Sequence, residues 1–277
     1  MRIDFYIAGI QKAGTTNLAY LLSNSTNIVT HPQLECTFFY DNREYHKGND
    51  YLKKTYFFNT IFKDEQYTLI KHSNSFSKPE ILRRVLKHSP QAQIILVFRN
   101  PIQRFVSSYL MEKTRSLYPL ELKDSVSKAL NDKNSFEHKV FYSFGLYDEW
   151  LTKIFQTVSD KNIHLFLFEE LYNDVEHHLE MFCSKYHITI DINKLKNLPI
   201  QNSQKLIKNH WYQKLYLHFR NSKLKNFIKP FIPIKHWVEL SKKIEHFNYI
   251  EPENKYIIDS EIENILKDAY LKFHKKI

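Results

Sequence analysis

The sequence predicts an α/β fold in which a parallel β-sheet lies between two layers of helices. Two observations carry this prediction. Short apolar runs alternate with helical patterns over about the first 190 of the 277 residues, and such alternation is typical of a parallel sheet covered on both faces. One run, from Ile94 to Phe98, is apolar at every position, as expected for a strand in the doubly buried centre of the sheet.

Four strands are expected, and a helix follows each of them. The expected strands are Asp4–Ala8, Tyr67–Lys71, Gln93–Phe98 and Asn162–Phe168. The helices that follow are Thr16–Asn24, Lys78–His88, Pro101–Arg115 and Asp174–Tyr186. Further helices are expected near Leu120–Asn131, Tyr142–Thr157 and Asn254–His274. Pro101 suits the first turn of its helix, where a missing N–H costs nothing.

The composition fits one folded domain with an appended C-terminal part. The chain is 43% hydrophobic, with 21 Phe and 18 Tyr, which is ample material for a core and excludes global disorder. Residues 205–245 are basic and aromatic, unlike the part before them. We therefore predict a single domain over residues 1–277, with an α/β core over 1–200 and a helical extension over 201–277.

The charge of the chain indicates anionic partners. The formal net charge is +10, which fits a phosphorylated cofactor, an acidic glycan, nucleic acid or an anionic membrane surface, although a solvated lysine-rich surface explains it equally well. Cys36 and Cys183 are too few for a disulfide framework or a zinc site and fit a reducing compartment, with one bridge left open. Because no apolar run approaches the ~18 residues of a membrane span and no signal peptide is apparent, we expect a cytoplasmic protein.

Two of the four glycines, Gly9 and Gly14, frame a loop between the first strand and its helix. Such a loop turns backbone N–H groups and a helix N-terminus toward an anion, usually phosphate. The loop nearly matches the P-loop pattern G-x-x-x-x-G-K-[ST], but Thr15 stands where the lysine belongs, and the lysine lies inside the loop as Lys12. A plain turn has no use for a cation among backbone amides, so a P-loop-like, nucleotide-binding core is predicted.

A second candidate anion site follows the strand Gln93–Phe98. Arg99 lies at the carboxyl edge of the predicted sheet, where open α/β sheets bind ligands. Ser107 and Ser108 follow about two helical turns later, within reach of a second phosphate. Arg104 would grip an anion with two hydrogen bonds or pair with a carboxylate. Taken alone, this stretch is more simply explained as a capped helix with a surface salt bridge. The presence of the loop at Lys12 makes an anion site the favoured interpretation.

Together the two stretches resemble the 5′-phosphosulfate and 3′-phosphate sites of sulfotransferases that use 3′-phosphoadenosine 5′-phosphosulfate (PAPS). Residues Ile7–Leu18 resemble the first family signature, and Ile95–Tyr109 resemble the second. Phe144–Tyr147 and Leu165–Leu171 are similar to later family landmarks. The resemblance covers roughly residues 3–200, and it is closest to the carbohydrate (heparan-sulfate-like) branch and its bacterial relatives.

The resemblance implies PAPS as co-substrate, 3′,5′-ADP as product and no metal. It implies a phosphosulfate pocket lined by Lys12, Ala13, Gly14, Thr15, Thr16 and Asn17, and a 3′-phosphate site at Arg99 and Ser107. Lys12 would then stabilise the charge that builds on the departing oxygen, helped by the helix N-terminus. The family's C-terminal lysine-glycine clamp is not visible, and Lys205 is considered as its substitute.

The resemblance also implies a catalytic base. Residues Thr30–Phe39 are similar to the family segment in which a glutamate precedes a Phe-Phe pair, and this match makes Glu35 the general base. The segment departs from the family pattern, because residues 32–34 replace the usual lysines and Tyr40 displaces an acidic residue. The cytosolic branch uses a histidine near a comparable strand end, so His72 is the rival base. We favour Glu35.

These observations predict a sulfotransferase that moves a sulfuryl group from PAPS to a hydroxyl of a carbohydrate or glycolipid acceptor. The alternatives are a P-loop kinase or nucleotide hydrolase, or a non-catalytic protein that binds nucleic acid or glycan; a nucleic-acid partner is not expected. Three interpretations of residues 205–245 stay open: a helical cap, an acceptor-binding wall, and peripheral contact with an anionic membrane.

Overall fold

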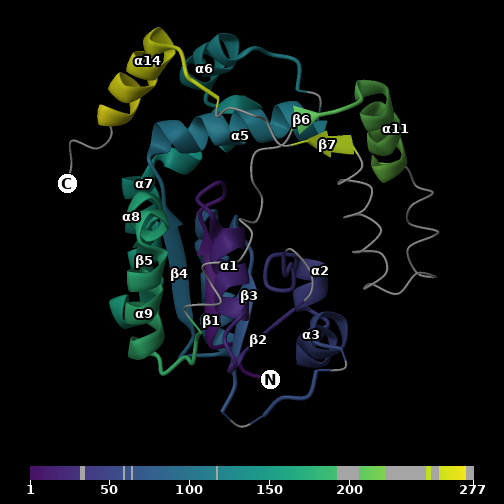
Figure 1. The fold of residues 1–277 in the computed structure, drawn as a ribbon, viewed down its shortest axis with the longest axis vertical. Helices are drawn as coiled ribbons and strands as arrows, with labels where there is room; N and C mark the ends of the chain where they lie inside the picture. Colours follow the sequence, from purple (N-terminus) through teal and green to yellow (C-terminus); the bar gives the residue numbers. More distant parts are fainter. Residues whose placement is uncertain are drawn as a thin grey trace.

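The centre of the fold is a sheet of five parallel strands, in the order β2-β3-β1-β4-β5 (Figure 1). A computed structural model describes residues 1–31, 35–58, 60–63, 65–116, 118–191, 206–221, 248–250 and 256–272. The strands are β1 (Phe5–Gly9), β2 (Ile28–Thr30), β3 (Tyr67–Lys71), β4 (Gln93–Phe98) and β5 (Ile163–Leu167). The predicted α/β class with a parallel sheet is confirmed.

The predicted strands are present, and the parallel sheet contains one further strand, β2, that was not predicted. The bounds of β3 and β4 are those expected, and β1 and β5 differ from the prediction by one residue at each end. β2 was missed because its three residues are too few to show a periodicity. It pairs with β3, with Val29 opposite Thr68.

Most predicted helices are present with small shifts at their ends. They are α1 (Thr15–Ser23), α4 (Pro79–His88), α5 (Pro101–Ser116), α6 (Leu122–Asn131) and α9 (Val175–Lys185). Helices that were not predicted are α2 (Asn42–Tyr45), α3 (Gly48–Tyr56) and α8 (Phe168–Asn173). Short 3₁₀ turns lie at Ser75–Ser77 and Asp160–Asn162.

The single helix expected over Tyr142–Thr157 is wrong. The chain forms a π-helical turn at Glu137–Tyr142, a 3₁₀ turn at Ser143–Gly145 and then helix α7, Tyr147–Phe155. A break occurs where the Tyr270 ring packs on Gly145, so closely that a Cβ there would lie 2.7 Å from the phenol oxygen. Tertiary packing therefore overrides the local helical pattern.

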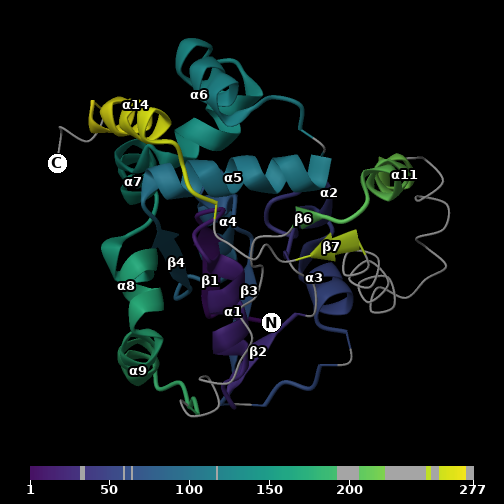
Figure 2. The same cartoon turned by 45° about the horizontal axis from the view of Figure 1, so that its top comes forward.

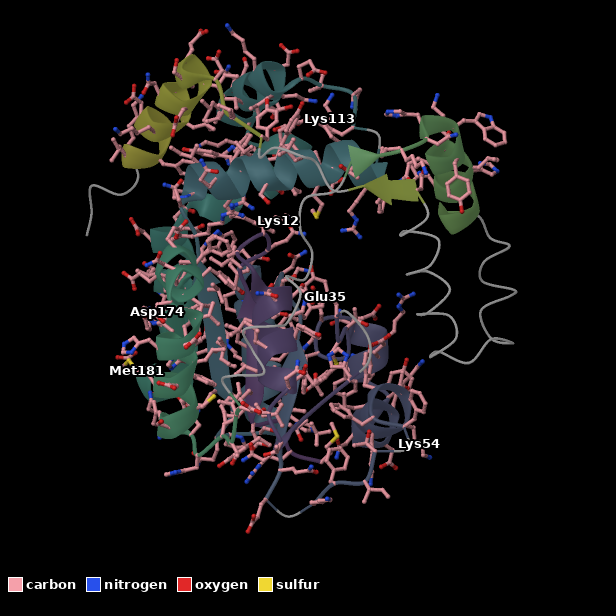
Figure 3. All side chains as sticks on the ribbon, viewed as in Figure 1. Lys12, Glu35, Lys54, Lys113, Asp174 and Met181 are labelled. Atoms are coloured by element: carbon pink, nitrogen blue, oxygen red, sulfur yellow. The ribbon has the colours of Figure 1, made fainter. Side chains whose placement is uncertain are left out.

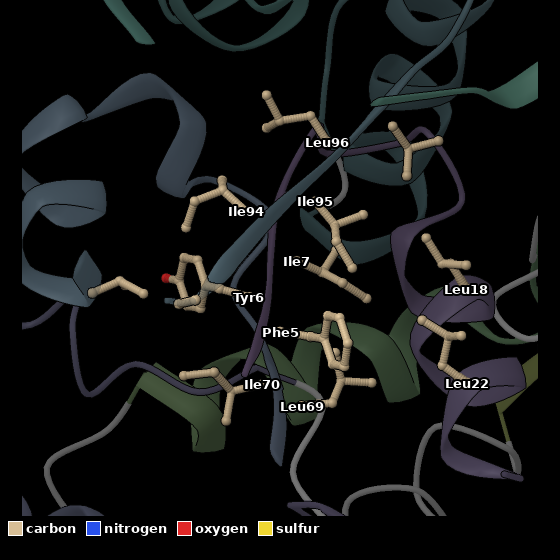
Figure 4. Close-up of a cluster of buried hydrophobic side chains, with 14 of the residues drawn as sticks. Phe5, Tyr6, Ile7, Leu18, Leu22, Leu69, Ile70, Ile94, Ile95 and Leu96 are labelled. Atoms are coloured by element: carbon tan, nitrogen blue, oxygen red, sulfur yellow. The ribbon is translucent and has the colours of Figure 1, made fainter. Parts of the chain in front are cut away.

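The core of the sheet is built by alternation along β1 (Figure 4). Phe5 and Ile7 face α1, beside Leu18 and Leu22. Phe5 also packs on Phe182 of α9, with 5.5 Å between ring centroids. All of these side chains are at most 5% exposed, and burying each one stabilises the fold by about 1.5–3 kcal/mol.

On the opposite face of the sheet, Tyr6 packs against Phe39 at 6.1 Å between ring centroids. The two faces of β1 are thus both covered, as the continuous apolar pattern predicted.

Helix α5 lies across the carboxyl ends of the strands (Figures 1 and 2). Above it, α6 and α14 (Ser260–Leu271) complete a second apolar core that includes Phe105, Val126 and Leu266. The helix predicted at Asn254–His274 begins later than expected, because the Asp259 side chain caps it by accepting the Glu261 N–H. This core joins α14 to α5 and α6, and one domain over residues 1–277 stays a prediction.

The described part of the C-terminal extension is not wholly helical. It contains α11 (His210–Asn221) and two antiparallel strands, β6 (Leu206–Ile207) and β7 (Tyr249–Ile250). The buried amide of Gln213 donates to the carbonyls of Thr114 and Arg115 at the end of α5. The extension is thereby joined to the helix that crosses the top of the sheet.

Both cysteines, Cys36 and Cys183, are buried and free. None of the helices that the structure describes is long and apolar enough to cross a bilayer.

Candidate active site

The predicted site residues that the structure describes lie at the carboxyl edge of the sheet, in the loops beneath α5 or on α5 itself. The loops after β1, β3 and β4 open at this edge because all the strands are parallel. Figure 3 shows Lys12 and Glu35 there, whereas Lys54 lies on α3, away from the edge. The parallel topology therefore brings together residues that are far apart in the sequence.

The loop after β1 has the backbone of an anion cradle. Lys12 and Gly14 both adopt left-handed conformations, with φ of 72° and 77°. Gly14 is the N-cap of α1 and supplies no side-chain cap. Because the first N–H groups of a helix lack intrahelical partners, those of Thr15 and Thr16 point out of this end of α1.

Lys12 is half-buried in a strongly positive region. Burial, together with the charges of Arg115, Arg99 and Arg104, lowers the pKa of its ammonium group to about 8, and the charge of Glu112 opposes part of this effect. Crowding cations at a partly buried point is unfavourable unless an anion joins them. The loop and its surroundings are therefore suited to a ligand with more than one negative charge.

Arg99 joins this loop to the one after β4. Its Nη1 donates to the Lys12 carbonyl at 3.0 Å, and its own carbonyl accepts from the Tyr147 hydroxyl at 2.6 Å. Burial lowers the pKa of Arg99, and the charge of Glu169 opposes this effect. The Nε of Arg99 is buried without a hydrogen-bond partner among the described residues. The two predicted anion sites are thus in direct contact.

Three polar side chains of α5 have different surroundings. Ser107 is half-buried, whereas Ser108 and Arg104 are completely buried. Of the two serines, only Ser107 is accessible to a ligand. The Nη2 of Arg104 donates to the carbonyls of Phe141 and Val140, and its Nε and Nη1 are buried without a hydrogen-bond partner among the described residues. It ties α5 to the π-helical turn, because the second core covers it entirely.

Glu35 is held by hydrogen bonds to both carboxylate oxygens. Its Oε1 accepts from Lys71 Nζ at 2.5 Å and from Ser73 Oγ at 2.7 Å, and its Oε2 accepts from Ser73 N–H at 3.0 Å. The Lys71 side chain is 4% exposed and that of Glu35 29%. Burial lowers the pKa of Lys71, and the pairing with Glu35 opposes this effect. Glu35 therefore presents a fixed, partly open carboxylate.

Lys71 and Ser73 were not predicted as site residues. Their position at the end of β3 was the available signal, since they flank the predicted rival base. Their partner Glu35 is 36 residues away in the sequence, and local patterns do not reveal such a pair.

His72 is less accessible than Glu35. It is 7% exposed, and its ring stacks on Tyr40 with 4.0 Å between centroids. Its Nδ1 lies 3.2 Å from Ser75 Oγ, and the Lys78 ammonium lies 4.1 Å from the Tyr40 ring centroid. Burial lowers the pKa of His72. The imidazole is therefore neutral, but it is confined between protein groups.

The remaining predicted residues are placed as follows. Ala13 is buried in the loop, where its N–H donates to the Ile10 carbonyl at 3.1 Å. Asn17 is buried and Thr16 half-buried in the first turn of α1. Lys205 and residues 32–34 lie outside the described residues. Among the described residues, no group of three or more His, Cys, Asp or Glu side chains is arranged to hold a metal ion.

Comparisons with known proteins give one consistent family. The family model described as "Sulfotransferase domain" matches residues 2–235. The bifunctional heparan sulfate N-deacetylase/N-sulfotransferase 1 of Caenorhabditis briggsae is 28% identical over 105 residues. That stretch is 38% of this chain but only 12% of the relative's length.

Solved structures show the same fold. A sulfotransferase from Alicyclobacillus acidocaldarius has a TM-score of 0.56 at 19% identity, with 86% of this chain and 99% of that chain covered. The sulfotransferase domain from the curacin biosynthetic pathway has a TM-score of 0.52 at 13% identity, covering 97% and 98%. Retinol dehydratase, solved with androsterone and the inactive cofactor PAP, has a TM-score of 0.50 at 15% identity, covering 100% and 82%.

Proposed function

Since this chain belongs to the sulfotransferase family, we propose that it transfers a sulfuryl group from PAPS to a hydroxyl of a carbohydrate acceptor and releases 3′,5′-ADP. The observation that carries this proposal is the 3.0 Å hydrogen bond from Arg99 Nη1 to the Lys12 carbonyl. It joins two cationic loops into one site at the edge of the sheet where Glu35 also lies.

The residues present fit a nucleotide that carries negative charge at both ends. Lys12 and the N-terminal turn of α1 would hold the 5′-phosphosulfate, because that turn offers N–H groups beside a cation. Arg99 and Ser107 would hold the 3′-phosphate, and the buried Nε of Arg99 still lacks a partner among the described residues. A buried donor without a partner is costly, and an anionic ligand would satisfy it.

Different side chains have different roles in the proposed transfer. PAPS supplies the sulfuryl group. Glu35 accepts the proton of the acceptor hydroxyl as that oxygen forms its bond to sulfur. Lys71 and Ser73 keep the carboxylate in a single orientation. Lys12 stabilises the charge left on the phosphate oxygen of 3′,5′-ADP when its bond to sulfur breaks.

Two observations support a carbohydrate as the acceptor. The sequence match to a protein named for heparan sulfate sulfation and the net charge of +10 favour a carbohydrate, and among carbohydrates an acidic one. The name of that relative specifies transfer to nitrogen, so the match supports the sugar and not the sulfated atom. That the sulfated group is a hydroxyl is our proposal, and the position of the label in the product tests it. Incorporation of labelled sulfate from PAPS into desulfated heparan sulfate tests the acceptor class directly.

Selective stabilisation by a 3′-phosphorylated nucleotide is the expected result of a thermal-shift comparison. At a concentration 100 times its Kd, 3′,5′-ADP stabilises the protein by about 2.7 kcal/mol, whereas ADP and ATP, which lack the 3′-phosphate, shift the melting temperature much less. Magnesium-dependent ATP turnover without any response to 3′,5′-ADP would instead indicate a kinase or nucleotide hydrolase. Steeply salt-dependent binding of DNA or RNA would indicate a nucleic-acid partner.

The affinity for 3′,5′-ADP is expected to fall as the pH rises from 7 to 9. The pKa of Lys12 in the free protein is about 8, so the ammonium is charged below this pH and progressively neutral above it. Above pH 8 the affinity should drop by up to about tenfold per pH unit.

Isothermal titration calorimetry across this range measures the effect. The matched variant is Lys12→Arg, whose side chain stays charged throughout, so its affinity should be independent of pH. Equal slopes for both proteins would show that another group is titrating.

A further inference from the structure

The short helix α8 contacts both anion-binding loops. The Phe168 ring lies under the Arg99 guanidinium, 4.5 Å from its Cζ to the ring centroid. The carboxylate of Glu169 accepts the Asn100 N–H at 2.9 Å. One turn later, the Tyr172 hydroxyl donates to the Gly14 carbonyl at 2.8 Å. Side chains of one six-residue helix therefore bridge the loop after β1 and the loop after β4.

The contact between α8 and Gly14 leaves no space for a side chain at position 14. A Cβ at Gly14 would lie 2.6 Å from Tyr172 Cε2 and 3.0 Å from Phe168 Cε2. The two rings support each other, with 4.7 Å between their centroids, because residues four apart lie on the same side of a helix. The backbone of the loop thus rests directly on a pair of rings.

The Tyr172 hydroxyl is a permanent donor in this position. Burial raises the pKa of the phenol, and a hydrogen bond with the Asn17 side chain opposes part of that effect. The proton therefore stays on Tyr172 throughout the physiological range. The Gly14 carbonyl also accepts the first helical bond of α1, from Leu18 N–H at 3.0 Å, so two donors fix the direction of this carbonyl.

The direction of that carbonyl sets the direction of the next N–H. A trans peptide is planar, and its C=O and N–H point in opposite directions. Holding the Gly14 oxygen toward Tyr172 and α1 therefore turns the Thr15 N–H the other way, out of the N-terminus of the helix. This is the first of the N–H groups proposed to receive the 5′-phosphosulfate.

We propose that Tyr172 is a positioning residue for sulfuryl transfer, whose hydroxyl orients the Gly14–Thr15 peptide for the 5′-end of the nucleotide. This inference rests on the proposed function. The Phe168 ring contacts both loops, but the hydrogen bonds of α8 are separate: the Tyr172 hydroxyl donates to Gly14 in the 5′-phosphate loop, and the Glu169 carboxylate accepts from Asn100 in the 3′-phosphate loop. Removing the Tyr172 hydroxyl alone should therefore affect the 5′-end of the nucleotide and leave the 3′-end unchanged.

The test is Tyr172→Phe, which removes the hydroxyl and keeps the ring. Calorimetry with 3′,5′-ADP and with 3′-AMP compares a nucleotide that has a 5′-phosphate with one that lacks it. We expect the affinity for 3′,5′-ADP to fall about fivefold, the equivalent of one hydrogen bond of about 1 kcal/mol, and the affinity for 3′-AMP to stay unchanged. A merely structural role would weaken both equally.

The matched control is Tyr186→Phe. The Tyr186 hydroxyl donates to Gln93 Oε1 at the same 2.8 Å, but Gln93 begins β4 at the opposite edge of the sheet, so neither affinity should change. Unchanged binding of 3′,5′-ADP by Tyr172→Phe, or an equal loss for both nucleotides, would overturn the role of Tyr172. If the unmodified protein fails to bind 3′,5′-ADP at all, the proposed function fails instead.

Discussion

Lys12→Ala is expected to lower the rate of sulfuryl transfer by about 10²–10³-fold, the usual effect of removing one preorganised group that stabilises transition-state charge. Lys12 lies in the loop that leads into α1, and the charges of Arg99 and Arg115 make its surroundings positive. No other lysine is placed within this loop. Release of 3′,5′-ADP from PAPS, with desulfated heparan sulfate as the acceptor, measures the loss.

A lysine far from the site provides the control for this variant. Lys54 is exposed on α3, away from the carboxyl edge of the sheet (Figure 3), and Lys54→Ala should retain full activity. Near-normal transfer by Lys12→Ala would show that the loop after β1 does not contact the reacting group.

Glu35→Gln is expected to bind 3′,5′-ADP as tightly as the unmodified protein and to lose about 10²–10⁴-fold in turnover. A glutamine side chain has the same shape and can still accept from Ser73, but it cannot take up the acceptor proton. Its neutral amide also leaves the buried Lys71 ammonium without its counter-charge. Calorimetry with 3′,5′-ADP and the PAPS-dependent transfer assay separate binding from chemistry.

The rival base is tested in the same assays. His72→Ala is expected to keep most of the turnover, because the imidazole is 7% exposed and stacked on Tyr40. A loss of turnover in His72→Ala together with retained activity in Glu35→Gln would assign proton transfer to the histidine. Melting temperatures of both variants exclude unfolding as the cause of a loss.

The two assays together also separate the donor site from the base. Loss of 3′,5′-ADP binding is expected only where a side chain contacts the nucleotide, as Lys12 and Arg99 are proposed to do. Loss of turnover with intact binding is expected at the acceptor side, where Glu35 lies. The geometry predicts this division because the two cationic loops touch each other, whereas Glu35 is held separately by the end of β3.

Where the signals are local, the sequence alone predicted the strands and the α/β fold well, whereas the donor-site residues stay a prediction. The position of β4 follows from its run of five apolar residues, Ile94–Phe98, since a strand buried on both faces is apolar nearly throughout. The loop at Lys12 and the turn at Arg99 were identified because each follows such a strand directly. Topology then places both loops at the same edge of the sheet, as a parallel α/β fold requires.

The tertiary structure alone decided which distant residues meet. The Glu35–Lys71 pair spans 36 residues, and the bond from Tyr172 to Gly14 spans 158. Arg104 was predicted to meet an anion or a carboxylate, but it is completely buried and donates to carbonyls of the π-helical turn. The same physical reason explains the Glu35–Lys71 pair, the bond from Tyr172 to Gly14 and the surroundings of Arg104. A local pattern reports the face and period of one element, whereas the groups that this element meets depend on how the crossover helices pack over the sheet.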